Sequence, residues 1–434
     1  MSVAAAPPLA RLGVRVERVP GMPIAALRVS FAGGARAEAL PGQALVAARS
    51  LAEGTRRRGH AELAERLEAR GILFHAGGGF ESHGVSLDAL AGDWEEALEL
   101  AAEIVFEPSF FFVSEVAEER CRWVARQTAA ELDSLADQPA VKTAWAFLDQ
   151  LYRPHRRALP LQGTREALAG LTAADCAAFH HRALAAGADG RGAVVTVAGD
   201  VDAAAVEAAV AAGFGERFER LAGEAVGPAE PFPGSPAPAG GAARVEVELP
   251  PPEPGEAPQG HLYLGHPTVD RRHPDFDALS LAAIVLGAGS GLTGRIPERI
   301  REREGLAYTA SADLVAGAGL DPGRLVVYVG TSPDTLEQAE RSAREELARF
   351  ADQGLSEAEF ADARAYLVGR APFRRETARQ IADLMVRAEH LRLPLDRPGW
   401  REERLAALTR DQVAAAVRRH VKPEELKVTL GVPA

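Results

Sequence analysis

The sequence predicts an α+β fold made of two similar halves, each with a largely antiparallel sheet and helices on one face. In each half a helix ends at a glycine and a strand follows at once, at Gly71 and again at Gly305. A hairpin partner and then a long helix come next, over residues 93–106 in the first half and 333–352 in the second. This shared order is most simply explained by duplication of a unit of roughly 200 residues.

Length and composition indicate a multidomain globular protein and exclude several classes. The chain has 434 residues, too many for one hydrophobic core, and 47% of them are hydrophobic. A net charge of −12 without a concentrated basic block argues against nucleic-acid binding. The chain has two cysteines, Cys121 and Cys176, both in expected helices. They are interpreted as small buried hydrophobic residues rather than as a disulfide framework.

Membrane and export signals are absent from the sequence pattern. No apolar run is long enough for a membrane-spanning helix. Residues 1–12 lack a basic start and a long apolar core, so they do not have the pattern of a signal peptide. We expect a cytoplasmic protein, or a periplasmic one if a signal peptide has been removed.

A segment rich in proline, glycine and alanine divides the chain at residues 229–241. More prolines follow at 250–254, beyond a short strand expected over 243–249. This composition is typical of a linker. We therefore expect an N-terminal domain over residues 1–222, a linker region over 223–256 and a C-terminal domain over 257–434.

The helical part of the first half begins with residues 44–53, where apolar residues recur at the spacing of one helix face and Gly54 ends the helix. A second amphipathic helix is expected over 60–71, and a strand over 72–76. In each half a helix is expected to open at a threonine, at Thr172 as N-cap or at Thr409, and to precede a strand at 194–198 or 426–430.

The amphipathic helices are expected to face a protein core. In the helix over 336–349, for example, apolar residues form one stripe. It lacks the combination of bulky aromatic residues and an opposite basic face that membrane-surface helices have. No membrane partner is therefore expected.

The order of helix, Gly54-Thr55, short basic loop, helix, glycine and strand resembles the zinc peptidases of the insulinase/pitrilysin family, over nearly the whole chain. In that family the helix before Gly-Thr carries His-x-x-Glu-His. Its histidines bind Zn²⁺ from one helix face, and its glutamate takes the proton of the metal-bound water. Counting back from Gly54, these positions are Leu45, Ala48 and Arg49. None of these three side chains can bind zinc or act as the base.

The family's third zinc ligand is a glutamate on a later helix. The resemblance places it near Ala125 or Arg126, and neither is a carboxylate. The resemblance therefore implies a homologue that has lost its metal site. We expect no metal and no cofactor in this chain, and no peptidase activity of the chain on its own.

The second half carries a segment, residues 292–308, that resembles another part of the family site. There an arginine and a tyrosine, seven residues apart, reach the active site from the C-terminal domain; by position they are Arg301 and Tyr308. Arginine can hold a carboxylate or a peptide carbonyl, and a tyrosine hydroxyl can donate to a developing oxyanion. The alternative stays open. Four arginines lie between 295 and 303, a pattern common on solvated faces, and Tyr308 can simply pack on a sheet.

Residues 286–294 are rich in glycine but lack the lysine of a P-loop and do not fit a dinucleotide-binding fingerprint. By resemblance they form the loop after the first helix of the second domain. They are comparable with the glycine-rich, substrate-contacting loop in the non-catalytic subunit of mitochondrial processing peptidase.

The histidines predict no second catalytic metal site. His75 and His83 are expected to face each other across a hairpin at 77–79. His180 and His181 are expected on different helix faces, and the carboxylates after His60 do not have a zinc-peptidase spacing. No Ser-His-Asp or Cys-His arrangement can be recognised either.

Two hypotheses from different functional classes follow from the resemblance. In the first, the chain is the non-catalytic subunit of a heterodimeric zinc peptidase. A partner subunit carries the zinc and His-x-x-Glu-His, the two enclose a chamber, and this chain binds the peptide substrate through Arg301 and Tyr308. In the second, the chain is a structural or peptide-binding scaffold without a role in hydrolysis, like the family members that are core subunits of respiratory complexes. A homodimer is also left open.

Overall fold

The chain folds into two compact units, each built on a five-stranded mixed sheet with helices. The computed structural model describes residues 12–112, 114–188, 192–215, 217–218, 243–252, 254–255, 257–289 and 293–434. Unit 1 comprises Met1–Leu132, Pro160–Phe232 and Pro372–Arg397, and unit 2 comprises Asp133–Leu159, Pro233–Ala371 and Pro398–Ala434. The predicted α+β class is confirmed.

The sheet of unit 1 has the strand order β1-β5-β2-β4-β3, in which β1 pairs parallel with β5 and the other pairs are antiparallel. Its strands are β1 (Gly13–Arg18), β2 (Ile24–Ala32), β3 (Leu73–Gly78), β4 (Ser82–Leu90) and β5 (Ala193–Gly199). The helices of this unit are α1 (Gln43–Ser50), α2 (His60–Glu68), α3 (Trp94–Phe106), α4 (Glu115–Ala136, which ends just beyond the unit), α6 (Arg165–Gly170), α7 (Ala173–Ala188), α8 (Ala203–Val210) and α14 (Ala378–Leu391).

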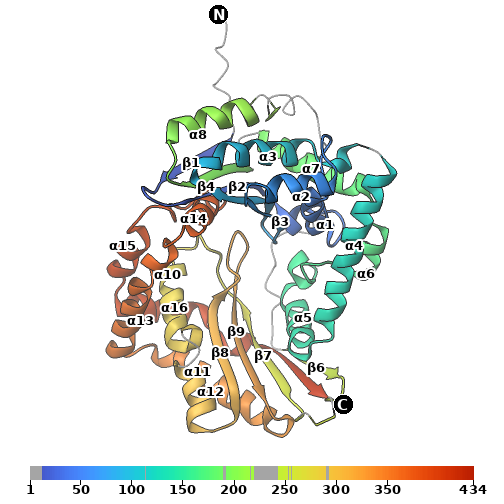
Figure 1. The fold of residues 1–434 in the computed structure, drawn as a ribbon. Coiled ribbons are helices and arrows are strands. Elements are labelled where there is room, and N and C mark those ends of the chain that lie inside the picture. The colour runs from blue at the N-terminus through green and yellow to red at the C-terminus, as the bar shows by residue number, and fades with distance from the viewer. Residues whose placement is uncertain are drawn as a thin grey trace, which may run out of the picture. The chain divides into compact units, whose positions relative to one another are not determined.

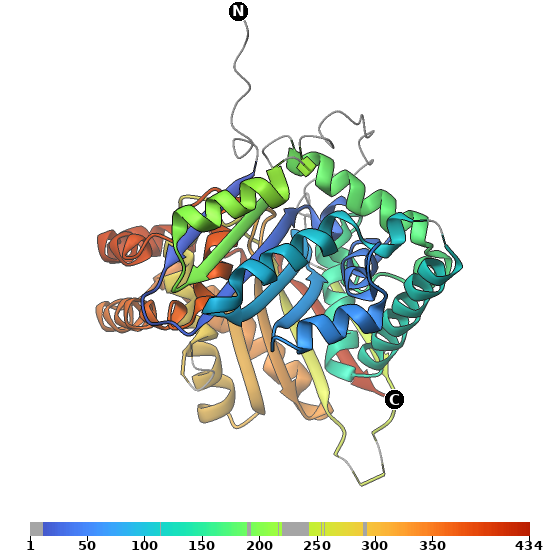
Figure 2. The ribbon, with the colours of Figure 1, turned by 45° about the horizontal axis from the view of Figure 1, so that its top comes forward.

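The two faces of this sheet differ in character because successive side chains of a strand point to opposite sides. Leu27, Val29 and Phe31 of β2 are buried on one face, where the Phe31 ring meets His180 of α7 at 5.6 Å between centroids. On the same side of the sheet, α3 and α8 lie over the strands (Figure 1), as the tilted view of Figure 2 also shows. This face forms the apolar core of unit 1.

The other face of the unit 1 sheet is covered by α14, a helix from the last quarter of the sequence. Ala26 and Ala198 pack against its apolar residues, among them Ile381 and Met385. Polar contacts follow on either side: Nε of Arg28 donates to Asp383 Oδ1 at 2.8 Å, Thr196 donates to the carbonyl of Ala382, and Ser30 Oγ lies 2.8 Å from His390 Nε2. A helix distant in sequence thus completes the second face.

Unit 2 repeats this arrangement with the strand order β6-β10-β7-β9-β8, in which only the β6–β10 pair is parallel. Its strands are β6 (Ala243–Leu249), β7 (Gly260–Pro267), β8 (Ala307–Ala316), β9 (Arg324–Thr331) and β10 (Lys427–Pro433). Its helices are α5 (Pro139–Tyr152), α10 (Phe276–Ala283), α11 (Arg295–Pro297), α12 (Leu336–Gln353), α13 (Glu357–Gly369), α15 (Trp400–Ala407) and α16 (Arg410–His420).

The faces of the second sheet follow the same rule. Leu262, Val327 and Leu430 belong to an apolar cluster shared with α10, α12 and α16. The opposite face is covered by α5, which comes from the first half of the sequence. The Phe147 ring of α5 stacks on Tyr263 at 5.8 Å between centroids, and the Gln150 amide donates to the Thr429 hydroxyl at 2.6 Å.

The two halves of the sequence therefore exchange one helical segment each. Residues 133–159 belong to unit 2 and residues 372–397 to unit 1, whereas the predicted domains, 1–222 and 257–434, follow the chain without exchange. The predicted linker region over 223–256 lies largely outside the described residues, which include β6 with the predicted bounds.

Most predicted elements are present within a few residues of their expected bounds. The helix expected over 44–53 is α1 followed by the short turn Leu51–Glu53, and Gly54 ends it at a φ of 110°. Thr172 accepts from the amide of Asp175 at 3.2 Å, as expected of an N-cap, and Thr409 accepts from Gln412 at 3.3 Å. Cys121 and Cys176 are buried and free, as predicted.

The predicted pairing of two histidines across the first hairpin is wrong. His75 pairs with Ser86, and His83 pairs with Gly78, because the hairpin register is shifted relative to the symmetric one expected. His83 consequently points into the core and His75 points outward. The buried ring of His83 lies against Phe31, Phe179 and His180, at 4.8 to 5.9 Å between centroids.

Two buried histidines of unit 1, His83 and His180, and the partly buried His390 should make stability fall in mild acid. Burial lowers the pKa of His180 and of His390 to about 4, and burial with nearby His180 and His390 lowers that of His83 well below 6.5. Because the folded pKa values are lowered, the unfolded chain binds more protons between about pH 6.5 and pH 4, so stability is lost as pH falls through that window. Urea unfolding from pH 7 to pH 4.5, followed by circular dichroism, measures it.

The variant His83→Phe isolates this effect. It keeps the ring against Phe31 and Phe179 but removes one titrating group, so its urea midpoint should fall less between pH 7 and pH 5 than that of the wild type. The exposed His75→Phe is the matched control and should follow the wild type. Equal pH dependence in all three proteins would contradict the assignment.

Candidate functional site

The candidate site is built on α1, the helix that holds the three motif positions of the resemblance. Glu38 fixes its N-terminal end, because its carboxylate accepts from the amides of Gly42 at 3.0 Å and Ala44 at 2.9 Å. Leu45 and Ala48 are buried within unit 1, at 4% and 0% exposure. Both side chains therefore belong to the protein core and not to a solvent-accessible site.

Arg49, the third motif position, binds to α4. Its Nη1 atom donates to Thr128 Oγ1 at 3.1 Å and lies 2.7 Å from a carboxylate oxygen of Glu131. Thr128 is itself buried and donates to the carbonyl of Val124. A guanidinium thus joins two helices at the position where the family places a metal-binding histidine. Nothing in the sequence pattern identified Thr128 and Glu131 as its partners.

The positions expected for the third metal ligand lie on α4. Ala125 is buried, and Arg126 is exposed and paired with Glu119 at 2.7 Å. Both line a cavity of about 580 Å³ between α4 and α6, whose charged lining is mainly arginine. The residues at the predicted positions offer packing groups and cations, which are unsuited to holding Zn²⁺.

The Gly54-Thr55 pair has a structural role in this chain. A Cβ on Gly54 would lie 2.9 Å from the carbonyl oxygen of Arg58, so the close turn requires glycine. Thr55 Oγ1 donates to Glu103 of α3 at 2.5 Å and accepts from the amides of Arg57 and Arg58 at 3.1 Å. The turn therefore ties α1 to α3 without any contribution from a metal.

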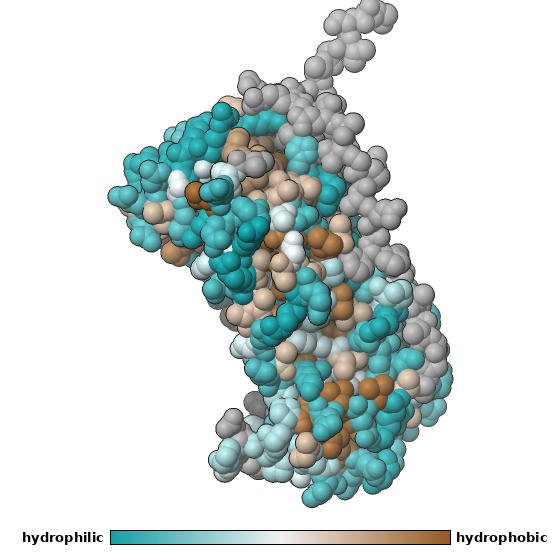
Figure 3. Space-filling model, turned by 90° about the vertical axis from the view of Figure 1, so that its right-hand side faces the viewer, coloured by the Kyte–Doolittle hydropathy of each residue, from teal (hydrophilic) through white to brown (hydrophobic). Residues whose placement is uncertain are grey.

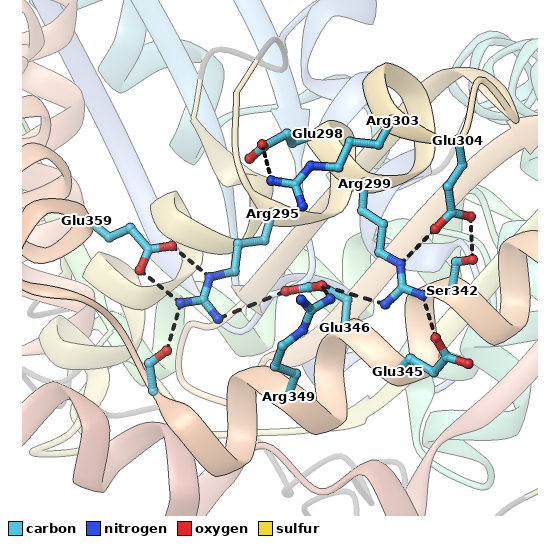
Figure 4. A network of polar contacts seen from close by, with 11 residues as sticks. Arg295, Glu298, Arg299, Arg303, Glu304, Ser342, Glu345, Glu346, Arg349 and Glu359 are labelled. Carbon is cyan, nitrogen blue, oxygen red and sulfur yellow. Dashed lines mark hydrogen bonds and ion pairs between the residues drawn. The ribbon is translucent and has the colours of Figure 1, made fainter.

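The arginines of residues 295–303 divide into two groups: three belong to a network of ion pairs (Figure 4), and Arg301 does not. Arg295 pairs with Glu359 at 2.7 Å, and Arg299 pairs with Glu304 at 2.8 Å and also with residues of α12. Arg303 pairs with Glu298 at 2.5 Å. The pairs of Arg295 and Arg299, whose side chains are 18% exposed, hold the wide helical turn η9 (Glu298–Arg303) and its neighbours in place.

Arg301 takes no part in this network. Its ion pair in the structure is with the adjacent Glu302, at 3.0 Å, and its side chain is 32% exposed. The interpretation of the whole run as one solvated face is therefore too simple, because Arg295 and Arg299 are 18% exposed and committed to internal partners. Arg301 and Arg303 are the members of the run with accessible guanidinium groups, and each pairs with an exposed glutamate of the same turn.

Tyr308 lies at the start of β8, an edge strand of the unit 2 sheet. The register changes there: Ala307 pairs with Thr331 and Thr309 with Gly330, so Tyr308 is the extra residue of a β-bulge. The side chain is 90% exposed and makes no polar contact with any residue that the structure describes. The expected alternative, a tyrosine packed on the sheet, is not what the structure has.

The glycine-rich segment follows α10, as the resemblance implies, in the turn Ile284–Ala288. Gly287 has a φ of 151°, and a Cβ there would lie about 3.0 Å from Pro297. This glycine therefore permits close packing. Residues 290–292 of the segment lie outside the described residues.

On the face drawn in Figure 3, hydrophobic residues lie in separate groups among hydrophilic residues. Across the described ranges, no helix has both the length and the apolar character needed to cross a bilayer.

Comparison with known proteins identifies the family. Residues 171–367 match the sequence profile of the peptidase M16 inactive domain. A protein of Mycobacterium leprae described as an uncharacterized zinc protease is 30% identical over 361 residues, which cover 82% of this chain and 76% of that protein. The chain belongs to the M16, or insulinase/pitrilysin, family. A non-peptidase homologue from Helicobacter pylori is 28% identical over a shorter stretch, 32% of this chain and 31% of that protein.

Solved structures of the M16 family share the fold. The peptidase M16 inactive domain from Pseudomonas fluorescens superposes with a TM-score of 0.82 at 23% identity, covering 98% of this chain and 97% of that one. A chain of complex III from Candida albicans has a TM-score of 0.72 at 17% identity, covering 96% and 93%. At these identities the likeness concerns the fold alone.

The matches bear on activity only in part. The profile of the inactive domain covers residues 171–367 and so does not include positions 45–49, whereas the mycobacterial relatives carry the name zinc protease. A non-catalytic role is consistent with the inactive-domain match.

Replacing Leu45 tests whether the former motif helix now serves packing. Leu45→Ala should lower the free energy of unfolding by about 2–5 kcal/mol, because it removes a buried side chain and leaves a cavity. The exposed Arg126→Ala is the control from the third-ligand position and should leave stability unchanged. Urea unfolding at pH 7 measures both. A neutral Leu45→Ala would show that position 45 is not part of the core.

Proposed function

We propose that this M16 protein is the non-catalytic subunit of a heterodimeric zinc peptidase and binds peptide substrate for a zinc-bearing family member. The partner supplies zinc and His-x-x-Glu-His, and this chain needs no cofactor of its own at the corresponding positions. The observation that carries the proposal is the contrast between Leu45, Ala48 and Arg49, which are committed to packing and helix contacts, and the accessible pair Arg301 and Tyr308.

Arg301 is suited to binding a substrate because its side chain is available at little cost. A ligand carboxylate or carbonyl competes only with an ion pair to the neighbouring Glu302, and such exposed pairs contribute little to stability. A guanidinium donates two parallel hydrogen bonds to a carboxylate, which gives orientation as well as affinity. The adjacent ion pairs of Arg295 and Arg299 keep the turn that carries Arg301 in place.

Tyr308 is suited to the same task by its place in the sheet. Bulges on edge strands change the direction of a side chain, and the ring of Tyr308 is exposed rather than packed. Its hydroxyl is a donor without an internal partner among the described residues. In the proposed complex it donates to the substrate carbonyl on which negative charge develops.

The competing function is a scaffold of the same fold without a role in hydrolysis. It would account equally well for the packed motif positions. It gives no reason for an unpaired, exposed tyrosine on a bulge, and this feature favours the subunit proposal. Activity measurements on the reconstituted complex separate the two functions.

The test uses this chain, the family member of the same organism that carries His-x-x-Glu-His, and their mixture, with cleavage of a fluorogenic peptide library as the readout. Activity should need both chains. In the mixture Arg301→Ala and Tyr308→Phe should each lower kcat/KM by roughly 10- to 100-fold. This is the effect of losing one hydrogen bond to a charged group or to an atom on which charge develops.

Two variants serve as matched controls. Arg303→Ala removes an arginine of the same turn, which is 65% exposed and paired with Glu298. Tyr366→Phe removes a hydroxyl on α13 that accepts a hydrogen bond from Arg370. Both should leave kcat/KM unchanged. A partner that is fully active alone, or variants at 301 and 308 that match the controls, would assign this chain to the scaffold class.

A further inference from the structure

We propose that unit 2 contains a binding site for a transition-metal dication, formed by His273, Asp275 and His420. Among the described residues, these three each offer a ligand atom, and the three atoms lie within 4.8 Å of one another. The histidines are far apart in sequence, so no local motif announced the cluster. It belongs to unit 2, whereas the former zinc positions belong to unit 1.

His273 and Asp275 are presented by a well-ordered turn that leads into α10. The amide of His273 donates to Asp270 Oδ1 at 3.1 Å, and the amide of Asp275 donates to Nδ1 of His273 at 3.1 Å. The amide of Phe276 donates to the carbonyl of His273 at 3.0 Å. The bonds from His273 to Asp270 and from Phe276 to His273 involve no imidazole, and they fix the backbone of this turn before a metal arrives, which lowers the entropic cost of binding.

His420 is the last residue of α16. Its Nε2 atom lies 2.8 Å from Asp275 Oδ2, and its ring meets His273 edge-on at 5.1 Å between centroids. The carboxylate and this imidazole are 18% and 17% exposed, so the site is partly shielded from water but open to entry. The C-terminal end of a helix carries a partial negative charge that favours a cation beside it.

Binding requires modest changes in the side chains. Ligand atoms around a tetrahedral Zn²⁺ are roughly 3.3 Å apart, so small rotations of the imidazoles close the site. Arg419 also pairs with Asp275 Oδ2 and has to leave, but its side chain is 58% exposed and can turn into solvent. Coordination through Nε2 of His273 would place the ring proton on Nδ1 and end its contact with the Asp275 amide. These losses predict moderate rather than very tight affinity.

The donor set indicates the class of metal. Two imidazoles and one carboxylate suit Zn²⁺, Co²⁺ or Ni²⁺, whereas Mg²⁺ and Ca²⁺ prefer all-oxygen sites. Three protein ligands leave further coordination positions for water or for a group of a bound molecule. The bound metal would also join the start of α10 to the end of α16, two helices that share the apolar core of unit 2.

Titration of the full-length protein with Co²⁺ tests the site, because tetrahedral or five-coordinate Co²⁺ has visible absorption bands. The wild type should bind one Co²⁺ per chain with saturation in the micromolar range, and Zn²⁺ should displace it while excess Mg²⁺ should not. His273→Ala and His420→Ala should each weaken binding at least 10-fold. The exposed His75→Ala is the matched control and should bind like the wild type.

Two results would overturn the proposal. One is the lack of saturable one-to-one binding by the wild type. The other is unchanged binding by the double variant His273→Ala/His420→Ala, provided that circular dichroism shows it folded, since the metal would then bind elsewhere. Zinc kept by that double variant would show that the metal binds at other residues of the chain.

Discussion

The structure depends on one constraint: a sheet buried on both faces needs a cover on each, and in both units the second cover comes from the other half of the sequence. In unit 1, α14 (Ala378–Leu391) packs its apolar residues on Ala26 and Ala198 and satisfies the polar groups between them. In unit 2, α5 (Pro139–Tyr152) does the same through an aromatic stack and hydrogen bonds from its glutamine. Without these helices, each sheet would leave apolar groups of its second face exposed to water, such as Ala26 and Ala198 in unit 1.

The same division explains which parts of the family pattern persist. The Gly54-Thr55 turn joins α1 to α3 by hydrogen bonds that unit 1 needs whether or not a metal is bound. The catalytic residues of the motif are not needed for folding in the way that this turn is. Packing residues and an interhelical arginine can therefore occupy their positions. In unit 2, Arg295 and Arg299 are fixed by internal pairs, whereas Arg301 and Tyr308 are not. Residues that are not committed to internal contacts are the ones available to bind a ligand.

The sequence predicted what local chemistry decides. Threonine caps, the glycine stop at Gly54 and apolar periodicity placed most helices and strands, and the family resemblance supplied the fold. The sequence could not predict the exchange of α5 and α14, because packing between segments distant in sequence decides which sheet each helix covers. His75 and His83 were expected to face each other across the hairpin, but its register pairs them with Ser86 and Gly78 instead. The bulge at Tyr308 and the meeting of His273 with His420 depend likewise on pairing that no single segment contains.

The exchanged helices also order events during synthesis. The sheet of unit 1 has all its strands once residue 199 has been made, yet the helix that covers its second face is encoded at 378–391. While the intervening residues emerge from the ribosome, a surface that includes Arg28, Ser30 and Thr196 stays open to solvent. Because these polar side chains are well hydrated, a face of this composition is less prone to aggregate while it is uncovered than an apolar face would be.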